Sequence, residues 1–196
     1  MTTEEAFVKV LQMHGIEHAF GIIGSAMMPI SDLFPQAGIK FWDCAHECNA
    51  GMSADGYTRA SGKMSMAIAQ NGPGITNFVT PIKTAYWNHT PLLLVTPQAA
   101  NKTIGQGGFQ EVEQMALFKD MVCYQEEVRD PSRVAEVLNP DRGEEPKCLS
   151  VWCTLRSATG TIHEVKSFKL AFISSPAEKL ANEAKAAISL QLVVAL

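Results

Sequence analysis

The chain has 196 residues, which is room for one domain or for one domain and an appendage. Apolar residues make up 46% of it and charged residues 18%, which is ordinary for a folded globular protein and argues against a disordered chain. The net charge of -4, with Lys and Arg scattered, gives no reason to expect nucleic acid or an anionic membrane as a partner.

No targeting or membrane-spanning segment is expected. The first residues, MTTEEAF, carry acids and no basic stretch, unlike a secretory signal. No run approaches the roughly 20 apolar residues that a membrane span needs. The five cysteines form neither a disulfide framework nor a convincing zinc spacing. We therefore expect a cytoplasmic protein with reduced thiols.

Apolar runs alternate with segments of helical spacing along the first 139 residues. Strands are expected at 18–21, 39–45, 64–69, 92–96 and 121–128. Helices are expected at 3–14, 29–34, 47–61, 73–87, 112–118 and 131–138. Continuous rather than alternating apolar strands are typical of a parallel sheet with helices on both faces, so the predicted fold class is α/β. Such a sheet binds ligands beyond the carboxyl ends of its strands, which makes candidates of the loops at 22–25, 46–47, 70–74 and 105–110.

Residues 140–196 differ in character from what precedes them. They open with a turn-rich charged segment, PDRGEEP; residues 148–155 alternate loosely like a strand, and 168–174 could pair with them. A capping box at 175–178 predicts a further helix. We expect one domain over 1–139 and a divergent tail over 140–196, aberrant or poorly ordered. A genuine alternative tail, a subunit boundary and a disrupted reading frame all remain open, and disruption is favoured.

The segment 46–62, HECNAGMSADGYTRASG, is the part of the chain most indicative of a site. It places an acid, Glu47, where a strand passes into a helix rich in small residues. Glycines at 51, 56 and 62 each cost roughly 1 kcal/mol of helix propensity relative to Ala. A helix that accepts this cost is usually approached closely by another part of the chain. Taken alone, an acid here is more often a helix N-terminal residue stabilised by the dipole, an effect worth under about 1 kcal/mol.

Several ordered motifs give the chain a family likeness over about residues 1–139. They are HE-x(2)-AG-x(2)-A-x-GY-x-RASG, NGPGITN and TAYWNHTPLLLVT. With them the chain resembles the pyrimidine-binding domain of thiamine-diphosphate enzymes of the acetolactate synthase type. The segments FGIIGSAMMPISDLFP and FWDCAHECNAGMSADGY are most similar to the sulfoacetaldehyde acetyltransferase branch. The closing strand of that family's domain, with its Pro-x-Asp motif, is not recognised after residue 139.

The resemblance implies roles for individual residues. Glu47 would be catalytic and cofactor-binding: its carboxyl would hydrogen-bond N1' of the aminopyrimidine and favour the imino tautomer, whose 4'-nitrogen takes the proton from the thiazolium C2. The family's wall against that ring corresponds to Asn71, Gly72, Pro73, Gly74 and Asn77. The residues expected to line the substrate are Ile23, Gly24, Ser25, His46, Phe109 and Gln110. His46 could instead be structural, and the Phe109–Gln110 pair could simply begin a helix.

The rest of a thiamine-diphosphate site is not found in the sequence. No GDG motif and no acid cluster spaced as magnesium ligands occurs, so no metal site is expected in this chain. The resemblance implies a chain that binds only the pyrimidine half of thiamine diphosphate, with Mg in the complete enzyme, and that is inactive alone. The implied reaction, part of taurine and sulfonate metabolism, turns sulfoacetaldehyde and phosphate into acetyl phosphate and sulfite.

Two other functions remain open. One is the pyrimidine-domain subunit of a split decarboxylase or acetolactate synthase-like complex, whose partner subunit carries the diphosphate domain. The other is a non-catalytic binding or assembly remnant. The expected partners are a sulfonated aldehyde and phosphate as small-molecule substrates, and either further copies of this chain in a homo-oligomer or a diphosphate-domain subunit.

Overall fold

A six-stranded sheet in which every strand pair is parallel forms the centre of the computed structural model. The structure describes residues 1–100, 103–122, 124–128, 130–134, 137 and 150–156. The strand order is β2-β1-β3-β4-β6-β5. The strands are β1 (His18–Gly21), β2 (Lys40–Asp43), β3 (Ser65–Ile68), β4 (Leu92–Gln98), β5 (Tyr124–Gln125) and β6 (Ser150–Arg156).

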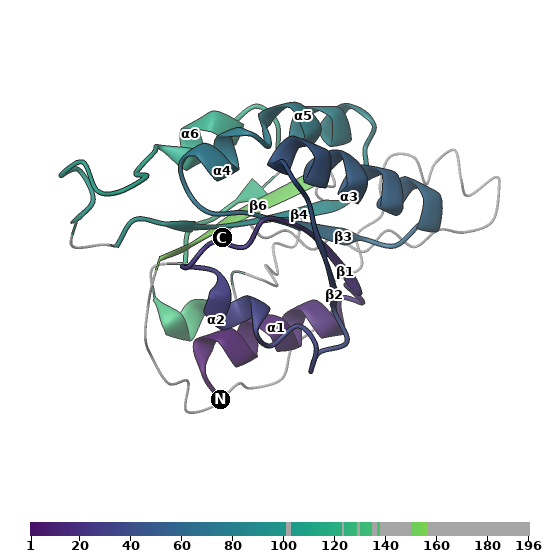
Figure 1. Ribbon diagram of the computed structural model, residues 1–196, viewed down its shortest axis with the longest axis horizontal. Helices are drawn as coiled ribbons and strands as arrows, with labels where there is room; N and C mark the ends of the chain where they lie inside the picture. Colours follow the sequence, from purple (N-terminus) through teal and green to yellow (C-terminus); the bar gives the residue numbers. More distant parts are fainter. Residues whose placement is uncertain (101–102, 123, 129, 135–136, 138–149, 157–196) are drawn as a thin grey trace.

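Helices cover both faces of this sheet (Figure 1). One face carries α1 (Thr3–Met13) and α2 (Met28–Ser31). The other carries α3 (Glu47–Ser61), α4 (Pro73–Thr76), α5 (Val79–Trp87) and α6 (Gln114–Phe118). A 3-10 turn, η2, covers Pro131–Arg133. The predicted α/β class, with a parallel sheet between two helical layers, is confirmed.

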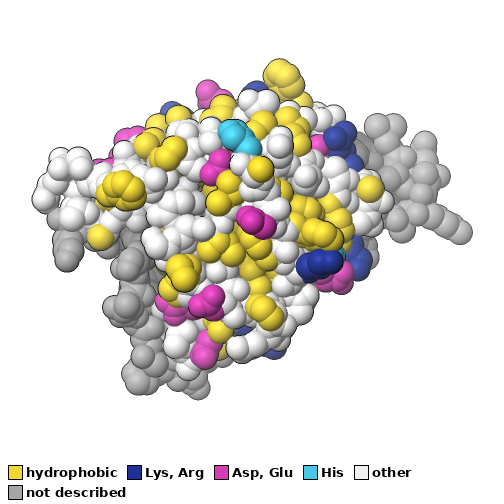
Figure 2. Space-filling model, in the orientation of Figure 1, with side chains coloured by type: hydrophobic (Ala, Val, Ile, Leu, Met, Phe, Trp, Pro, Cys, Tyr) yellow, Lys and Arg dark blue, Asp and Glu magenta, His cyan; other side chains and the backbone are white. Residues whose placement is uncertain are grey.

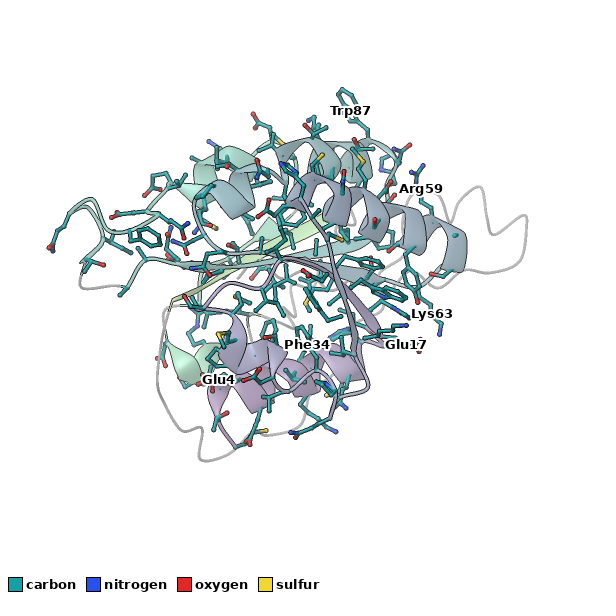
Figure 3. All side chains as sticks on the ribbon, viewed as in Figure 1. Glu4, Glu17, Phe34, Arg59, Lys63 and Trp87 are labelled. Atoms are coloured by element: carbon teal, nitrogen blue, oxygen red, sulfur yellow. The ribbon has the colours of Figure 1, made fainter. Side chains whose placement is uncertain are left out.

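Burial on both faces explains why the central strands are apolar throughout. Every residue of β3 is buried, as are the first six of β4. Phe7, Phe34, Phe78 and Phe118 are among the largest fully buried side chains, and they belong to one hydrophobic cluster. Phe34 lies on the α1–α2 side of the sheet (Figure 3). Continuous apolar strands are therefore what this architecture requires.

The edge strand β2 differs from the central strands because it is largely exposed. Trp42 is 41% exposed, and its indole Nε1 donates to Nδ1 of His18 on β1 at 2.8 Å. The Lys40 ammonium lies 3.8 Å from the centre of the Trp42 ring. These contacts hold the strand edge against β1, and the strand covers four residues rather than the predicted 39–45.

At the amino ends of the strands a surface ion pair joins two connections. Lys63 precedes β3, Glu17 precedes β1, and their charged groups lie 2.8 Å apart (Figure 3). The pairing lowers the pKa of the Glu17 carboxyl and raises the pKa of the Lys63 ammonium. On the face shown in Figure 2, the remaining basic and acidic side chains are scattered rather than gathered by sign.

Several predicted elements are shorter or broken. The helix predicted over 73–87 is two helices, α4 and α5, separated by Asn77 and Phe78. The strand predicted over 121–128 is reduced to β5. The helix predicted at 29–34 is a single turn, and the one at 112–118 begins at Gln114. Of the helix predicted at 131–138, the described part forms η2.

The strand-like pattern at 148–155 corresponds to β6, and its partners correct the sequence-based expectation. β6 lies between β4 and β5, with Leu92 opposite Ser150 and Tyr124 opposite Val151. The strand-like segment is therefore part of the main sheet, where the sequence analysis had assigned it to a divergent tail. The proposed partner segment 168–174 and the helix from 175 lie outside the described residues. The domain boundary at 139 stays a prediction.

Within the residues that the structure describes, no helix is long and apolar enough to cross a membrane.

Candidate functional site

Four loops leave the same edge of the sheet because all strands are parallel. They follow β1, β2, β3 and β4, and they include the segments predicted to line a site at 22–25, 46–47, 70–74 and 105–110. Hydrogen bonds and close contacts between residues of these loops show which of the four segments touch one another. Parallel sheets place ligands at this carboxyl edge.

The acid singled out in the sequence begins α3 and is held in place by an amide. Glu47 is the first residue of the helix and is half-buried. Its Oε2 accepts a hydrogen bond from Nδ2 of Asn77 at 2.9 Å. Asn77 belongs to the two-residue break between α4 and α5, so the break aims a donor at the carboxylate. The structure thus brings together two residues that the sequence predicted for one site.

A buried glycine, Gly74, packs beside this carboxylate. A Cβ at Gly74 would lie 3.4 Å from Oε1 of Glu47 and 3.3 Å from Cβ of Ala69. The absence of a side chain at Gly74 therefore prevents crowding next to the acid. The turn before it needs glycine for a different reason, because Gly72 has φ 69° and a Cβ there would lie 2.7 Å from the Gln110 carbonyl oxygen.

Amide groups connect the 70–74 turn to the segment that follows β4. The Asn71 side chain is buried, and its Nδ2 donates to the carbonyl oxygen of Gln110 at 2.9 Å. Because a carbonyl can only accept, this bond fixes which end of the Asn71 amide is the donor. Its Oδ1 accepts from Nε2 of Gln70 at 2.8 Å, and Gln110 is thereby joined to the turn.

Gln70 is a residue of this site that the sequence analysis missed. Its Nε2 is committed to Asn71, so its Oε1 is an acceptor. That oxygen is buried and has no hydrogen-bond partner in the described part of the chain. A Cβ at Gly24 would collide with the Gln70 amide, which brings the 22–25 loop into the same cluster. The sequence signal that could have identified Gln70 as a site residue is its position between a strand and the Asn-Gly-Pro-Gly turn.

The predicted substrate-lining residues divide into two groups. Gly24 and Gln110 are in contact with the cluster through Gln70 and Asn71. Ser25 is exposed, and Phe109 is 85% exposed. A role for any of them in contacting substrate stays a prediction.

His46 has a structural contact that its sequence position left open. It is the N-cap of α3 in an extended conformation, and its Nδ1 accepts from the backbone N–H of Cys48 at 3.1 Å. The imidazole thus satisfies one of the free donors at the start of the helix that carries Glu47. Its predicted role at the substrate is not tested by this contact.

The groups at this edge can hold and move a proton, and they are not arranged as metal ligands. Glu47 offers a carboxylate with one oxygen oriented by Asn77 and the other next to Gly74. Among the described residues, no group of three or more His, Cys, Asp or Glu side chains could hold a metal ion.

Comparison with known proteins finds a matching family and named relatives. Residues 1–117 match the family described as thiamine pyrophosphate enzyme, N-terminal TPP binding domain. The chain is 87% identical over 139 residues to the sulfoacetaldehyde acetyltransferase of Roseovarius nubinhibens and 84% identical over 139 residues to a probable sulfoacetaldehyde acetyltransferase of Rhizobium meliloti. It is 35% identical over 136 residues to a probable acetolactate synthase large subunit of Methanocaldococcus jannaschii.

These alignments cover most of this chain but only a small part of each relative. They cover 71%, 71% and 69% of this chain, in the order given, but only 23%, 24% and 23% of the relatives. The chain therefore spans about a quarter of the length of the relatives it matches. Because the matched family model accounts for more than half of its residues, the chain belongs to the family of thiamine pyrophosphate enzyme N-terminal TPP binding domains.

Proposed function

We propose that this chain provides the pyrimidine-binding half of a thiamine-diphosphate site in an enzyme of the sulfoacetaldehyde acetyltransferase type. The observation that carries the proposal is the Glu47 carboxylate, held by Asn77 beside Gly74. Three relatives at 81–87% identity bear the name sulfoacetaldehyde acetyltransferase, one of them as probable, which supports the choice of enzyme.

The residues present fit an aminopyrimidine ring. A ring nitrogen needs a hydrogen-bonding partner, which Glu47 would offer, and a flat ring needs neighbours that carry no side chain, as Gly74 does beside Glu47. The buried oxygen of Gln70, without a partner among the described residues, adds an acceptor for a ring substituent. Thiamine diphosphate, when bound, supplies the carbon nucleophile of the reaction.

The chain's own residues would then prepare the cofactor. Glu47 would hydrogen-bond the ring nitrogen and hold the proton that is exchanged with the ring. Asn77 would orient the carboxyl by donating to its other oxygen. The complete enzyme would convert sulfoacetaldehyde and phosphate to acetyl phosphate and sulfite. Magnesium and the diphosphate would be bound by a further domain, in a homo-oligomer or on a partner subunit.

We also propose a cytoplasmic location for this protein. Cys44 and Cys48 are free and half-buried in the structure, as expected for thiols in a reducing compartment.

Binding of thiamine diphosphate to the purified full chain tests the half-site. Titration followed by ligand-detected NMR should show weak binding that Glu47→Gln reduces about tenfold, because the charge-assisted hydrogen bond to the ring is lost. Glu113→Gln is the matched control, since Glu113 is an exposed acid at the start of α6. Equal binding by the wild type and Glu47→Gln would contradict the proposed role of Glu47.

A second variant tests the role of Gly74. Gly74→Ala places a methyl group 3.4 Å from Glu47 Oε1, in the space assigned to the ring. We expect a folded protein, with a circular-dichroism spectrum like that of the wild type, whose affinity for thiamine diphosphate falls at least as much as that of Glu47→Gln. Undiminished affinity would place the ring elsewhere.

A hybrid enzyme tests the reaction. Residues 1–139 of this chain would replace the matching segment of the Roseovarius nubinhibens relative, which supplies the remaining domains. With magnesium and thiamine diphosphate, the hybrid should form acetyl phosphate and sulfite from sulfoacetaldehyde and phosphate, and Glu47→Gln should lower kcat on the order of a hundredfold. Formation of acetolactate from pyruvate instead would favour the acetolactate synthase-like alternative.

A further inference from the structure

The glycine-rich segment at 103–111 is closed on itself by one side chain, Glu111. The carboxylate Oε1 accepts a hydrogen bond from the Gly105 N–H at 2.6 Å, and Oε2 accepts from the Gly108 N–H at 3.0 Å. The Glu111 N–H donates to the Gly108 carbonyl at 3.1 Å. Gly105 and Gly107 have φ of 79° and 70°, a backbone conformation that glycine adopts without steric cost and that belongs to neither a helix nor a strand. One ionised acceptor with two N–H partners is a strong constraint on such a loop.

The residue next to Glu111 is held in an unusual conformation. Gln110 has φ 56°, and the one other non-glycine residue with positive φ in the described part of the chain is His89. A side chain makes this region unfavourable, so the surrounding contacts must maintain it. On one side the Gln110 carbonyl accepts from Asn71 at 2.9 Å. On the other side the chain continues directly into Glu111.

We propose that Glu111 is a positioning residue: it fixes the loop so that Gln110 keeps its left-handed conformation and its carbonyl remains on Asn71. Glu111 itself does not contact Glu47 or Gly74. Its effect on a ligand passes through Gln110 and through the Asn71–Gly72 turn, where the Gln110 carbonyl packs closely. This inference rests on the proposed function for the identity of the ligand, although the contact that it explains exists without one.

The side-chain amide of Asn71 is the reporter for this role. In the ¹⁵N-labelled full chain, its Nδ2 hydrogens should exchange slowly with solvent because the Asn71 side chain is buried and Nδ2 donates to the Gln110 carbonyl. Glu111→Ala should accelerate that exchange at least tenfold and move the signal towards that of a free amide. Glu113→Ala is the matched control, because Glu113 is exposed and its side chain makes no cap hydrogen bond. An Asn71 signal that is unchanged in Glu111→Ala would overturn the proposal.

A rescue variant separates positioning from general loss of stability. Glycine adopts positive φ without steric cost, so Gln110→Gly should help the loop keep its shape without the brace. In the Glu111→Ala background it should therefore restore part of the protection of the Asn71 amide. If the double variant is no better protected than Glu111→Ala, the conformation of Gln110 is not what Glu111 maintains, and the proposal fails.

Titration with thiamine diphosphate distinguishes this inference from the proposed function. Glu111→Ala should weaken binding severalfold. If the wild-type chain shows no binding that depends on Glu47, the proposed function fails, while the Asn71 signal still decides the role of Glu111. If binding is Glu47-dependent and Glu111→Ala leaves it unchanged, Glu111 does not position the ligand site and the proposal is overturned.

Discussion

The glycines of α3 have three different roles, although the sequence suggested one. Gly51 is where another helix comes close, because a Cβ there would lie 2.6 Å from Pro81 and 2.9 Å from Phe78. Gly62 ends the helix with φ 71°. A Cβ at Gly56 would meet nothing within 4 Å. The prediction of close approach is therefore confirmed for Gly51 and is wrong for Gly56, because spacing along a helix does not tell which face another helix covers.

This difference predicts opposite effects of the same substitution. Gly51→Ala should destabilise the protein by about 2 kcal/mol, because the methyl group overpacks against the rigid Pro81 ring. Gly56→Ala should stabilise it by about 0.5–1 kcal/mol, because alanine restricts the unfolded chain and favours the helix. Urea unfolding of the two variants beside the wild type measures both changes. Equal effects would mean that α3 and α5 are not packed as described.

The methionines show the same limit at the scale of single side chains. Methionine is an apolar residue that commonly fills gaps in a core. Met27, Met64 and Met66 are buried, but Met28 and Met52 are 51% and 37% exposed. Met27 and Met28 are adjacent in sequence, and only the direction of the short α2 decides which of them faces the core.

Among the elements, α3 carries a buried charge whose partner is on its exposed side. The Asp55 carboxylate is fully buried, and the Arg59 guanidinium, 54% exposed, lies 2.6 Å from it one turn later. The two groups form an ion pair without hydrogen-bond geometry, since neither Asp55 oxygen has a hydrogen-bond partner in the described part of the chain. Figure 3 shows Arg59 on the outer side of the helix.

Removing the cation should therefore cost more than removing the pair. Arg59→Met leaves a buried carboxylate without its counter-charge and should destabilise the protein by about 2 kcal/mol, less than for a fully buried pair because the Arg59 head is partly solvated. Adding Asp55→Asn should recover at least half of that loss, since a neutral amide is cheaper to bury. Thermal unfolding of the single and double variants measures this. A double variant as unstable as Arg59→Met would show that the buried charge is not the cause.

The sequence predicted best those elements whose first and last residues are marked by neighbouring residues, such as a cap or a glycine. β1 was predicted with its exact bounds, and α1 begins with the Thr2–Glu5 capping box. The break between α4 and α5 has no comparable local signal. It exists because Phe78 is fully buried while Asn77 turns its amide to Glu47, a contact 30 residues away in sequence. The same holds for the site. The parallel strands predicted which loops would lie at one edge of the sheet. They did not predict the hydrogen bond from Gln70 to Asn71 or the backbone N–H groups that donate to Glu111.

For the whole molecule, the position of β6 bears on where the domain ends. β6 pairs with β4 on one side and with β5 on the other. It therefore covers one edge of the buried strand β4 and connects β5 to the sheet. A chain ending at residue 139 lacks these hydrogen bonds and would leave β4 with an open edge.

Truncation after residue 139 should therefore impair folding. We expect the 1–139 fragment to be less soluble and to unfold at a lower temperature than the full chain, because β4 loses a neighbour on one side and β5 loses its pairing. Circular dichroism and size-exclusion chromatography compare the two proteins. A fragment that is as stable and as soluble as the full chain would instead support a domain complete at 139.

The stability of the whole molecule should also depend on the pH through one histidine. His14 ends α1, is 6% exposed, and its Nδ1 has no hydrogen-bond partner in the described part of the chain. Burial lowers its pKa from 6.5 to about 4. The unfolded chain therefore binds a proton at a higher pH than the folded chain, so this group leaves stability unchanged above about pH 6.5 and reduces it as the pH falls towards 4.

The loss available from this group is on the order of 3 kcal/mol. His14→Gln removes the titration, so the free energy of unfolding of the wild type minus that of the variant should fall as the pH is lowered from about 7 to about 4.5. Urea unfolding at several pH values measures this difference, which cancels the carboxylates common to both proteins. A difference that does not change with pH would mean that His14 is solvated, and that the end of α1 is not packed against the sheet as the structure has it.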